Sequence, residues 1–255
     1  MPEILHSNII GEGRSLLILH GFLGSGDNWI SLARRWAKEG FRVHLIDLRN
    51  HGKSFWSDRF DLEVLLQDLD NYIAFHRLDK PHLLGHSLGG KILMFDAVKN
   101  PVNRGKYIIV DIAPKAYPPH HQFIFDALKA VNPALYRSRE DIEKALEPYI
   151  SQRPIRLFIM KNLKRTPEGF AWKINIPVLE RAMHESGKAL PPGTRYDKEI
   201  LFLRGTKSPY ISDTDIDLIR QHFPEARIVN IPAGHWLHAE KPEAVFRAVK
   251  TFLSS

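Results

Sequence analysis

Ser87 is the residue best suited to nucleophilic chemistry in this chain of 255 residues. The stretch 85–89 reads GHSLG and lies between an apolar run at 83–84 and a helical pattern. A G-x-S-x-G sequence between a strand and a helix forms a sharp turn that lifts the serine oxygen above the edge of a sheet. Glycines on either side leave room for the strained backbone. We therefore predict that Ser87 is a nucleophile; a glycine-rich turn used only for packing is the alternative.

A serine hydroxyl is a weak nucleophile and needs a neighbouring base. His235 is the candidate base, because it follows the last predicted strand, directly after Gly234. The carboxyl ends of parallel strands meet at one edge of a sheet, so His235 and Ser87 are expected at the same edge. His238 is the competing histidine and is interpreted as structural. His86 adjoins the nucleophile but should point sideways from it.

The acid that orients the base has several candidates. In many enzymes of this kind an aspartate follows a late strand in a Gly-x-x-Asp setting, but here residues 205–208 read GTKS, with Ser208 in the place of the carboxylate. Asp111 ends the strand after the Ser87 strand and should lie at the same edge. Asp213 and Asp215 are alternatives, although both are placed near the start of a helix. We favour Asp111, which gives the chain order nucleophile, acid, base.

Two backbone N–H groups are candidates for an oxyanion hole, which would stabilise the negative charge that develops on a carbonyl oxygen under attack. Leu88 directly follows the nucleophile. Phe22 lies in the glycine-rich loop at 20–26, after an early strand. These are the two positions that supply such donors next to a nucleophile elbow.

Alternating strands and helices would place these residues. Helices are expected between the strands and after the last one, and residues 3–10 could add an edge strand. Such alternation predicts an α/β fold with a mostly parallel sheet flanked by helices. The buried strands are predicted at 15–19, 41–47, 106–111, 199–205 and 226–231, with one more after Pro81 that ends at the Ser87 turn.

The alternation stops between residues 114 and 198. No buried-strand run occurs there, and amphipathic helices are expected near 120–131, 138–151 and 154–164. We interpret 114–198 as a helical cap inserted into a core made of 1–113 and 199–255. Five residues of the cap could line an acyl pocket, or serve equally well as ordinary core: Phe123, Phe125, Leu157, Phe158 and Met160.

Composition excludes several classes of function. The chain has no cysteine, which rules out a thiolate nucleophile, disulfides and cysteine metal sites. Its net charge is +7, but no run of five or more Lys and Arg and no nucleic-acid motif occurs. No stretch is long and apolar enough to span a membrane, and no signal peptide is seen at the N-terminus. We expect a cytoplasmic protein, a monomer or homodimer, that needs no metal or cofactor and binds no nucleic acid.

The motifs together resemble the α/β-hydrolase superfamily. The resemblance rests on HGF at 20–22, DLRNHGKS at 47–54, GHSLGGK at 85–91, DIAP at 111–114, SPY at 208–210 and GHWLHAEKP at 234–242. The segments at 47–52 and 111–114 narrow it to the YbfF-type bacterial acyl-CoA esterase group, related to the α/β-hydrolase-domain-11 proteins. This resemblance implies hydrolysis of short- to medium-chain acyl esters and thioesters, and it implies Asp111 as the acid. We expect Asn50 and His51 mainly to brace loops.

The predicted reaction is a two-step acyl transfer to water. Ser87 would attack an acyl ester or thioester carbonyl while His235 takes its proton, and water would then cleave the acyl-enzyme. One alternative keeps the fold and changes the bond: a carbon–carbon hydrolase or a cofactor-free haloperoxidase. A second alternative is a non-catalytic member that binds its ligand in the same pocket.

Overall fold

The main sheet of the described residues has seven strands. The computed structural model describes residues 2–99 and 101–254, so residues 1, 100 and 255 of the predicted core lie outside the described residues. The strands follow the order β1-β3-β2-β4-β5-β8-β9, and only β1 runs antiparallel to its neighbour. The predicted mostly parallel sheet is thus confirmed. The strands are β1 Ser7–Ile10, β2 Arg14–Leu19, β3 Phe41–Ile46, β4 His82–His86, β5 Tyr107–Val110, β8 Ile200–Gly205 and β9 Ala226–Ile231.

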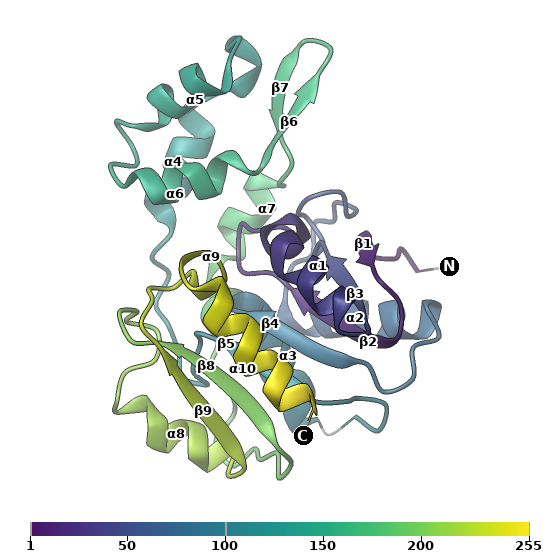
Figure 1. Ribbon diagram of the computed structural model, residues 1–255. Coiled ribbons are helices and arrows are strands. Elements are labelled where there is room, and N and C mark those ends of the chain that lie inside the picture. The colour runs from purple at the N-terminus through teal and green to yellow at the C-terminus, as the bar shows by residue number, and fades with distance from the viewer. Residues whose placement is uncertain (1, 100, 255) are drawn as a thin grey trace.

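Helices cover both faces of this sheet (Figure 1). Helices α1 (Ile30–Lys38) and α10 (Pro242–Ser254) pack on one face, where Trp36 and Val249 are buried against strand residues. Helices α2 (Leu62–Phe75), α3 (Leu88–Val98) and α8 (Asp215–His222) contribute to the core on the other face. The strands are therefore buried from both sides, which explains their continuous apolar runs.

The chain between β5 and β8 forms an insertion that stands above the carboxyl ends of the strands (Figure 1). Its helices are α4 Gln122–Ala130, α5 Arg139–Leu146, α6 Arg153–Met160 and α7 Ile176–Arg181. The first three overlap the predicted helices 120–131, 138–151 and 154–164, but α5 ends at 146, and residues 163–164 of the third predicted helix belong to a strand, so the insertion is not purely helical. Strands β6 (Leu163–Thr166) and β7 (Gly169–Trp172) form an antiparallel hairpin that the sequence pattern did not predict.

The pairing of β4, β5 and β8 positions the candidate site. His86 pairs with Val110, and Val110 pairs with Leu203, so the residues that follow them come out side by side. The N–H of Ser87 donates to Val110 O at 3.0 Å, and the N–H of Asp111 donates to Leu203 O at 2.9 Å. No helix within the described ranges is both long and apolar enough to cross a membrane.

Candidate active site

Ser87 lies in a strained turn between β4 and α3. Its φ and ψ angles are 52° and −112°, in a region that L-residues rarely adopt. A Cβ on Gly85 would lie 2.3 Å from Gly89 O, and a Cβ on Gly89 would lie 2.2 Å from Leu19 O. Both glycines are therefore required by the tight approach of α3 to the ends of β2 and β4. Strain of this kind persists at functional sites because the surrounding packing enforces it.

A hydrogen bond joins His235 and Asp111 beside this turn. Nδ1 of His235 donates to Oδ2 of Asp111 at 2.8 Å, and the Asp111 side chain is fully buried. The N–H of Gly205 donates to Oδ1 at 2.9 Å, and the Ser208 hydroxyl donates to Oδ2. Three donors compensate for burial of the carboxylate. The proton held on Nδ1 leaves Nε2 of His235 free to accept another proton.

Two further contacts fix His235. Nε2 of His86 donates to the backbone O of His235 at 2.9 Å, and burial holds the pKa of His86 well below its usual value. The Tyr210 ring stacks on the His235 ring with 3.8 Å between centroids and 14° between planes. The imidazole is thus held at its Nδ1 edge, at its backbone and on one face.

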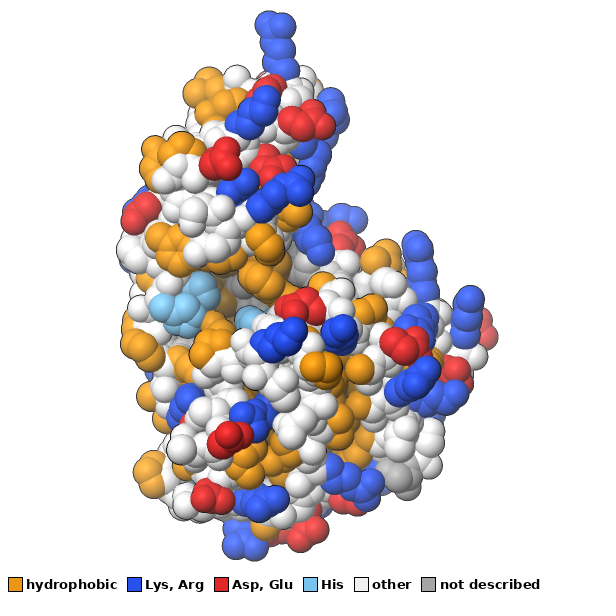
Figure 2. Space-filling view, turned by 60° about the vertical axis from the view of Figure 1, so that its left-hand side comes forward, with side chains coloured by type: hydrophobic (Ala, Val, Ile, Leu, Met, Phe, Trp, Pro, Cys, Tyr) orange, Lys and Arg blue, Asp and Glu red, His pale blue; other side chains and the backbone are white. Residues whose placement is uncertain are grey.

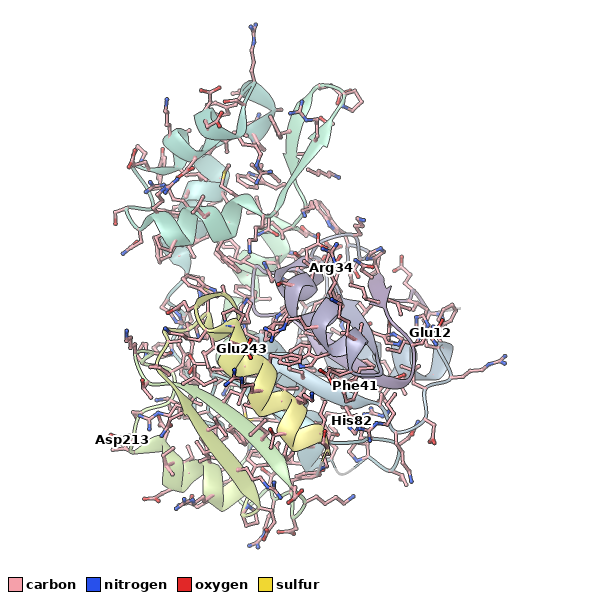
Figure 3. All side chains as sticks on the ribbon, in the orientation of Figure 1. Glu12, Arg34, Phe41, His82, Asp213 and Glu243 are labelled. Carbon is pink, nitrogen blue, oxygen red and sulfur yellow. The ribbon has the colours of Figure 1, made fainter. Side chains whose placement is uncertain are left out.

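The alternative acids lie in other ion pairs. Asp213 pairs with Arg204 at 2.7 Å and its side chain is 93% exposed. Figure 3 labels Asp213 at the outer edge of the molecule, beside α8. Asp215 begins α8 and accepts from Nζ of Lys115 at 2.7 Å. Of the three predicted acids, only Asp111 contacts His235.

The loop that carries Phe22 is fixed from both sides. The N–H of Leu23 donates to Nε2 of His51 at 3.2 Å, and Leu23 O accepts from the side-chain amide of Asn162 in the insertion at 2.8 Å. Nδ1 of His20 donates to Gly21 O at 2.8 Å. On the other side of Ser87, Leu88 is the first residue of α3, where a backbone N–H has no partner within its helix. Phe22 thus lines the same cavity as Ser87, and Leu88 follows Ser87 directly.

His51 and Asn50 have the bracing contacts expected of them. Nδ1 of His51 donates to Arg49 O at 2.9 Å, while its Nε2 accepts from Leu23. Burial lowers the pKa of His51 to about 3, so the ring is neutral and can accept and donate at once. The Asn50 side chain bonds to the backbone of Ser57 and to Asn175 of the insertion.

A mostly apolar cavity of about 180 Å³ opens above Ser87 and His235. Insertion residues Phe123, Ile124, Ile155 and Phe158 line it together with Trp236. Histidine side chains are visible at the narrow waist between the insertion and the sheet, with hydrophobic side chains around them (Figure 2). Of the five predicted pocket residues, Phe123 and Phe158 line this cavity. Phe125 is instead buried in the core against Phe22, with ring centroids 6.0 Å apart.

Sequence reasoning missed two histidines and assigned no role to Tyr210. His120 and His121 follow a Pro-Pro pair and line the cavity together with Tyr210. Nδ1 of His120 donates to Pro118 O at 2.9 Å, which leaves Nε2 to accept from the Tyr210 hydroxyl at 2.7 Å. No spacing rule connects residues 120 and 210, so only the fold of the insertion reveals this contact. Across the residues that the model describes, no cluster of three or more His, Cys, Asp or Glu side chains could hold a metal ion.

Comparison with known proteins identifies the family. The family model described as "Alpha/beta hydrolase family" matches residues 16–248. The chain belongs to the α/β-hydrolase family. Among curated relatives, it is similar to Esterase YbfF of Escherichia coli, at 33% identity over 242 residues that cover 94% of this chain and 92% of the relative. The sn-1-specific diacylglycerol lipase ABHD11 of Danio rerio is 34% identical, over 95% of this chain and 79% of that protein.

A solved structure supports the same conclusion. The chain superposes on a marine microorganism esterase with a TM-score of 0.92 and 38% identity, covering 98% of this chain and 100% of the other. The resemblance inferred from the motifs is thus confirmed. The protein is a carboxylic ester hydrolase, an esterase or lipase of the α/β-hydrolase family.

Proposed function

We propose that the protein hydrolyses short- to medium-chain acyl esters and thioesters, including those of coenzyme A, with Ser87 as nucleophile, His235 as base and Asp111 as the acid that orients it. The observation that carries this proposal is the 2.8 Å bond from His235 Nδ1 to Asp111, at the same sheet edge as the strained Ser87 turn. We assign catalysis to the core of 1–113 and 199–255. Selection of substrate falls to the cap of 114–198.

The reaction proceeds in two steps. Nε2 of His235 removes the Ser87 proton as Oγ attacks the carbonyl carbon, and the N–H groups of Phe22 and Leu88 bind the oxyanion. The protonated His235 then donates to the leaving alkoxide or thiolate, which departs from the acyl-enzyme. Water, deprotonated by His235, attacks the acyl carbon and releases the acid and free Ser87.

The test is hydrolysis of a p-nitrophenyl acyl ester by the wild type, by Ser87→Ala and by Ser151→Ala, whose serine is exposed on the insertion. Ser87→Ala should lose roughly 10⁴-fold or more in kcat, with Ser151→Ala unchanged. A fluorophosphonate probe should label the wild type and Ser151→Ala but not Ser87→Ala. Retained turnover in Ser87→Ala would reject the mechanism, and turnover restricted to carbon–carbon bonds or to halide with peroxide would favour the alternatives on this fold.

The coenzyme A part of the proposal rests on the net charge of +7 and on the resemblance. A basic surface attracts phosphate-bearing leaving groups, and this attraction weakens as salt screens it. We expect kcat/KM for an acyl-CoA to decrease when the salt concentration is raised from 20 to 500 mM. The kcat/KM for the matched p-nitrophenyl ester should stay constant. Equal salt dependence for both substrates would remove this part of the proposal and leave the esterase mechanism intact.

A further inference from the structure

Two cavities meet at Ser87. The larger, about 180 Å³, is bounded by His235, Trp236 and insertion residues. The smaller, about 20 Å³, is also lined by Ser87, but His235 does not line it. Both share the Phe22 loop and Ser87 with His120, His121 and Tyr210, so one substrate can extend into both. The smaller cavity is further lined by Ile112, Tyr117, Pro118, Pro119, Met183, Ser186 and Gly187.

The chemistry of acyl transfer decides which part of the substrate enters which cavity. The tetrahedral carbon carries the Ser87 oxygen, the oxyanion, the leaving group and the acyl substituent. The leaving atom must lie within hydrogen-bond reach of His235, which protonates it. It therefore lies on the side of the cavity that His235 lines. The acyl substituent points away from this side, toward the cavity that His235 does not line.

The smaller cavity is rigid as well as small. A single water molecule needs roughly 10–15 Å³ on the same measure, so about 20 Å³ holds little more than one methyl or ethyl group. Tyr117, one wall, is fixed by three bonds: its N–H donates to Gly187 O at 2.8 Å, its hydroxyl accepts from Ala113 N–H at 2.9 Å, and the hydroxyl donates to Tyr210 O. Gly187, another wall residue, packs tightly against Tyr117, because a Cβ on Gly187 would lie 2.1 Å from Tyr117 O.

Building on the proposed function and narrowing its acyl range, we propose that the cavity between Ser87 and Met183 is an acyl subsite for groups of two or three carbons, and that the larger cavity receives the leaving group. Met183 is the specificity-determining residue. Its side chain is buried, flexible and free of the bonds that fix Tyr117, so it is the part of the wall whose truncation enlarges the subsite without disturbing the oxyanion loop. This inference places acyl selection on the side of Ser87 away from Phe123 and Phe158.

Matched p-nitrophenyl acetate, butyrate and hexanoate test the subsite, with the leaving group held constant. For the wild type we expect kcat/KM to fall about tenfold or more from acetate to hexanoate, since each methylene that does not fit is worth roughly that much. Met183→Ala should raise hexanoate turnover at least tenfold and change acetate turnover by less than threefold. Phe158→Ala, in the larger cavity, is the matched control: it should leave the acyl-chain profile unchanged and weaken discrimination between ethyl and hexyl acetate.

Each outcome separates the subsite from the mechanism. The wild type could hydrolyse hexanoate as fast as acetate while a fluorophosphonate still labels Ser87. This result would overturn the subsite and leave the proposed function standing. A change of acyl profile in Phe158→Ala but not in Met183→Ala would exchange the roles of the two cavities and also overturn it. Loss of labelling together with unchanged ester turnover in Ser87→Ala would overturn the proposed function itself. The wild-type profile tests the limit of two or three carbons, and Phe158→Ala tests which cavity sets it, even where Met183→Ala is too unstable to purify.

Discussion

Replacing Asp111 with asparagine should disable the base by changing its tautomer. The backbone N–H of Gly205 donates to Oδ1 of Asp111 and cannot reverse its direction, so an asparagine at 111 must turn its oxygen toward Gly205. Its NH₂ group then faces His235 and Ser208. The Ser208 hydroxyl can rotate and become an acceptor, but Nδ1 of His235 must lose its proton to accept from the amide. The proton moves to Nε2, the atom that should receive the proton of Ser87.

The size of the loss follows from this reversal. A triad with the wrong tautomer loses roughly 10⁴-fold in kcat, and each tenfold corresponds to about 1.4 kcal/mol of barrier. We expect Asp111→Asn to lower kcat by 10³- to 10⁴-fold, or about 4–5.5 kcal/mol. KM should change little, because Asp111 is buried behind His235 and does not line the cavity.

The assay is steady-state hydrolysis of p-nitrophenyl acetate, with thermal unfolding as the check on folding. Asp213→Asn is the matched control, since it removes the same charge from an exposed pair with Arg204 and should change kcat by less than twofold. Asp215→Asn tests the remaining alternative acid. The assignment of Asp111 would be refuted if Asp111→Asn kept more than a tenth of the wild-type kcat. It would also be refuted if Asp213→Asn or Asp215→Asn lost a large part of kcat.

Three other perturbations probe groups that support the site. Tyr210→Ala should lower kcat about tenfold with KM nearly unchanged, because the ring stacked on His235 is lost. Tyr210→Phe keeps the ring, so its kcat should stay within threefold of the wild type. Equal losses of kcat in the two variants would contradict a stacking role. Burial lowers the pKa of Lys91 to about 7, so between pH 7 and 10.5 Lys91 is protonated in the unfolded chain but not in the folded one. The free energy of unfolding therefore rises with pH in this range, by about 1.4 kcal/mol per pH unit. Urea unfolding of Lys91→Met should lack this rise, which exposed Lys99→Met keeps. Burial also lowers the pKa of His238 to about 3, so its stabilising contribution is full above pH 6.5 and is lost as the pH falls. Between pH 7 and pH 5, the free energy of unfolding should therefore fall less for His238→Phe than for the wild type, and equal falls would refute this.

Most of the sheet could be predicted from the sequence because its strands are buried on both faces. Runs such as 16–19 and 107–110 are wholly apolar, and burial on both faces produces that pattern. The β6–β7 hairpin could not be predicted in the same way. Its strands have four residues each, and Lys164 and Arg165 are exposed in β6, so no apolar run marks it. Helix α7 is also not predicted, since six residues are too few for a helical period to show.

In the candidate site, too, some residues can be predicted from the sequence and others cannot. Ser87, Asp111 and His235 all follow strands of one parallel sheet, and the rule that such strands end at one edge is enough to bring them together. The contacts of His120, His121 and Asn162 depend on how the insertion folds back over that edge. Helical periodicity gives the length and the apolar face of an inserted helix but not its direction relative to the sheet. Phe123 and Phe158 of the cavity can be predicted from the helical pattern, but its other residues from the insertion stay hidden from the sequence.

The position of the acid shows how sheet geometry can replace a motif. The sequence at 205–208 lacks the carboxylate expected after β8, and Ser208 stands in its place. The pairing of β5 between β4 and β8 allows a residue at the end of β5 to reach both sides: Asp111 meets His235 and also accepts from Gly205 and Ser208 of the β8 loop. Its φ of 50° turns the chain at this point, as it does at Ser87 with a φ of 52°. Ser208 therefore contributes a donor to a carboxylate that comes from the neighbouring strand, and the β8 loop still takes part in holding Asp111 against His235 although it carries no carboxylate of its own at 208.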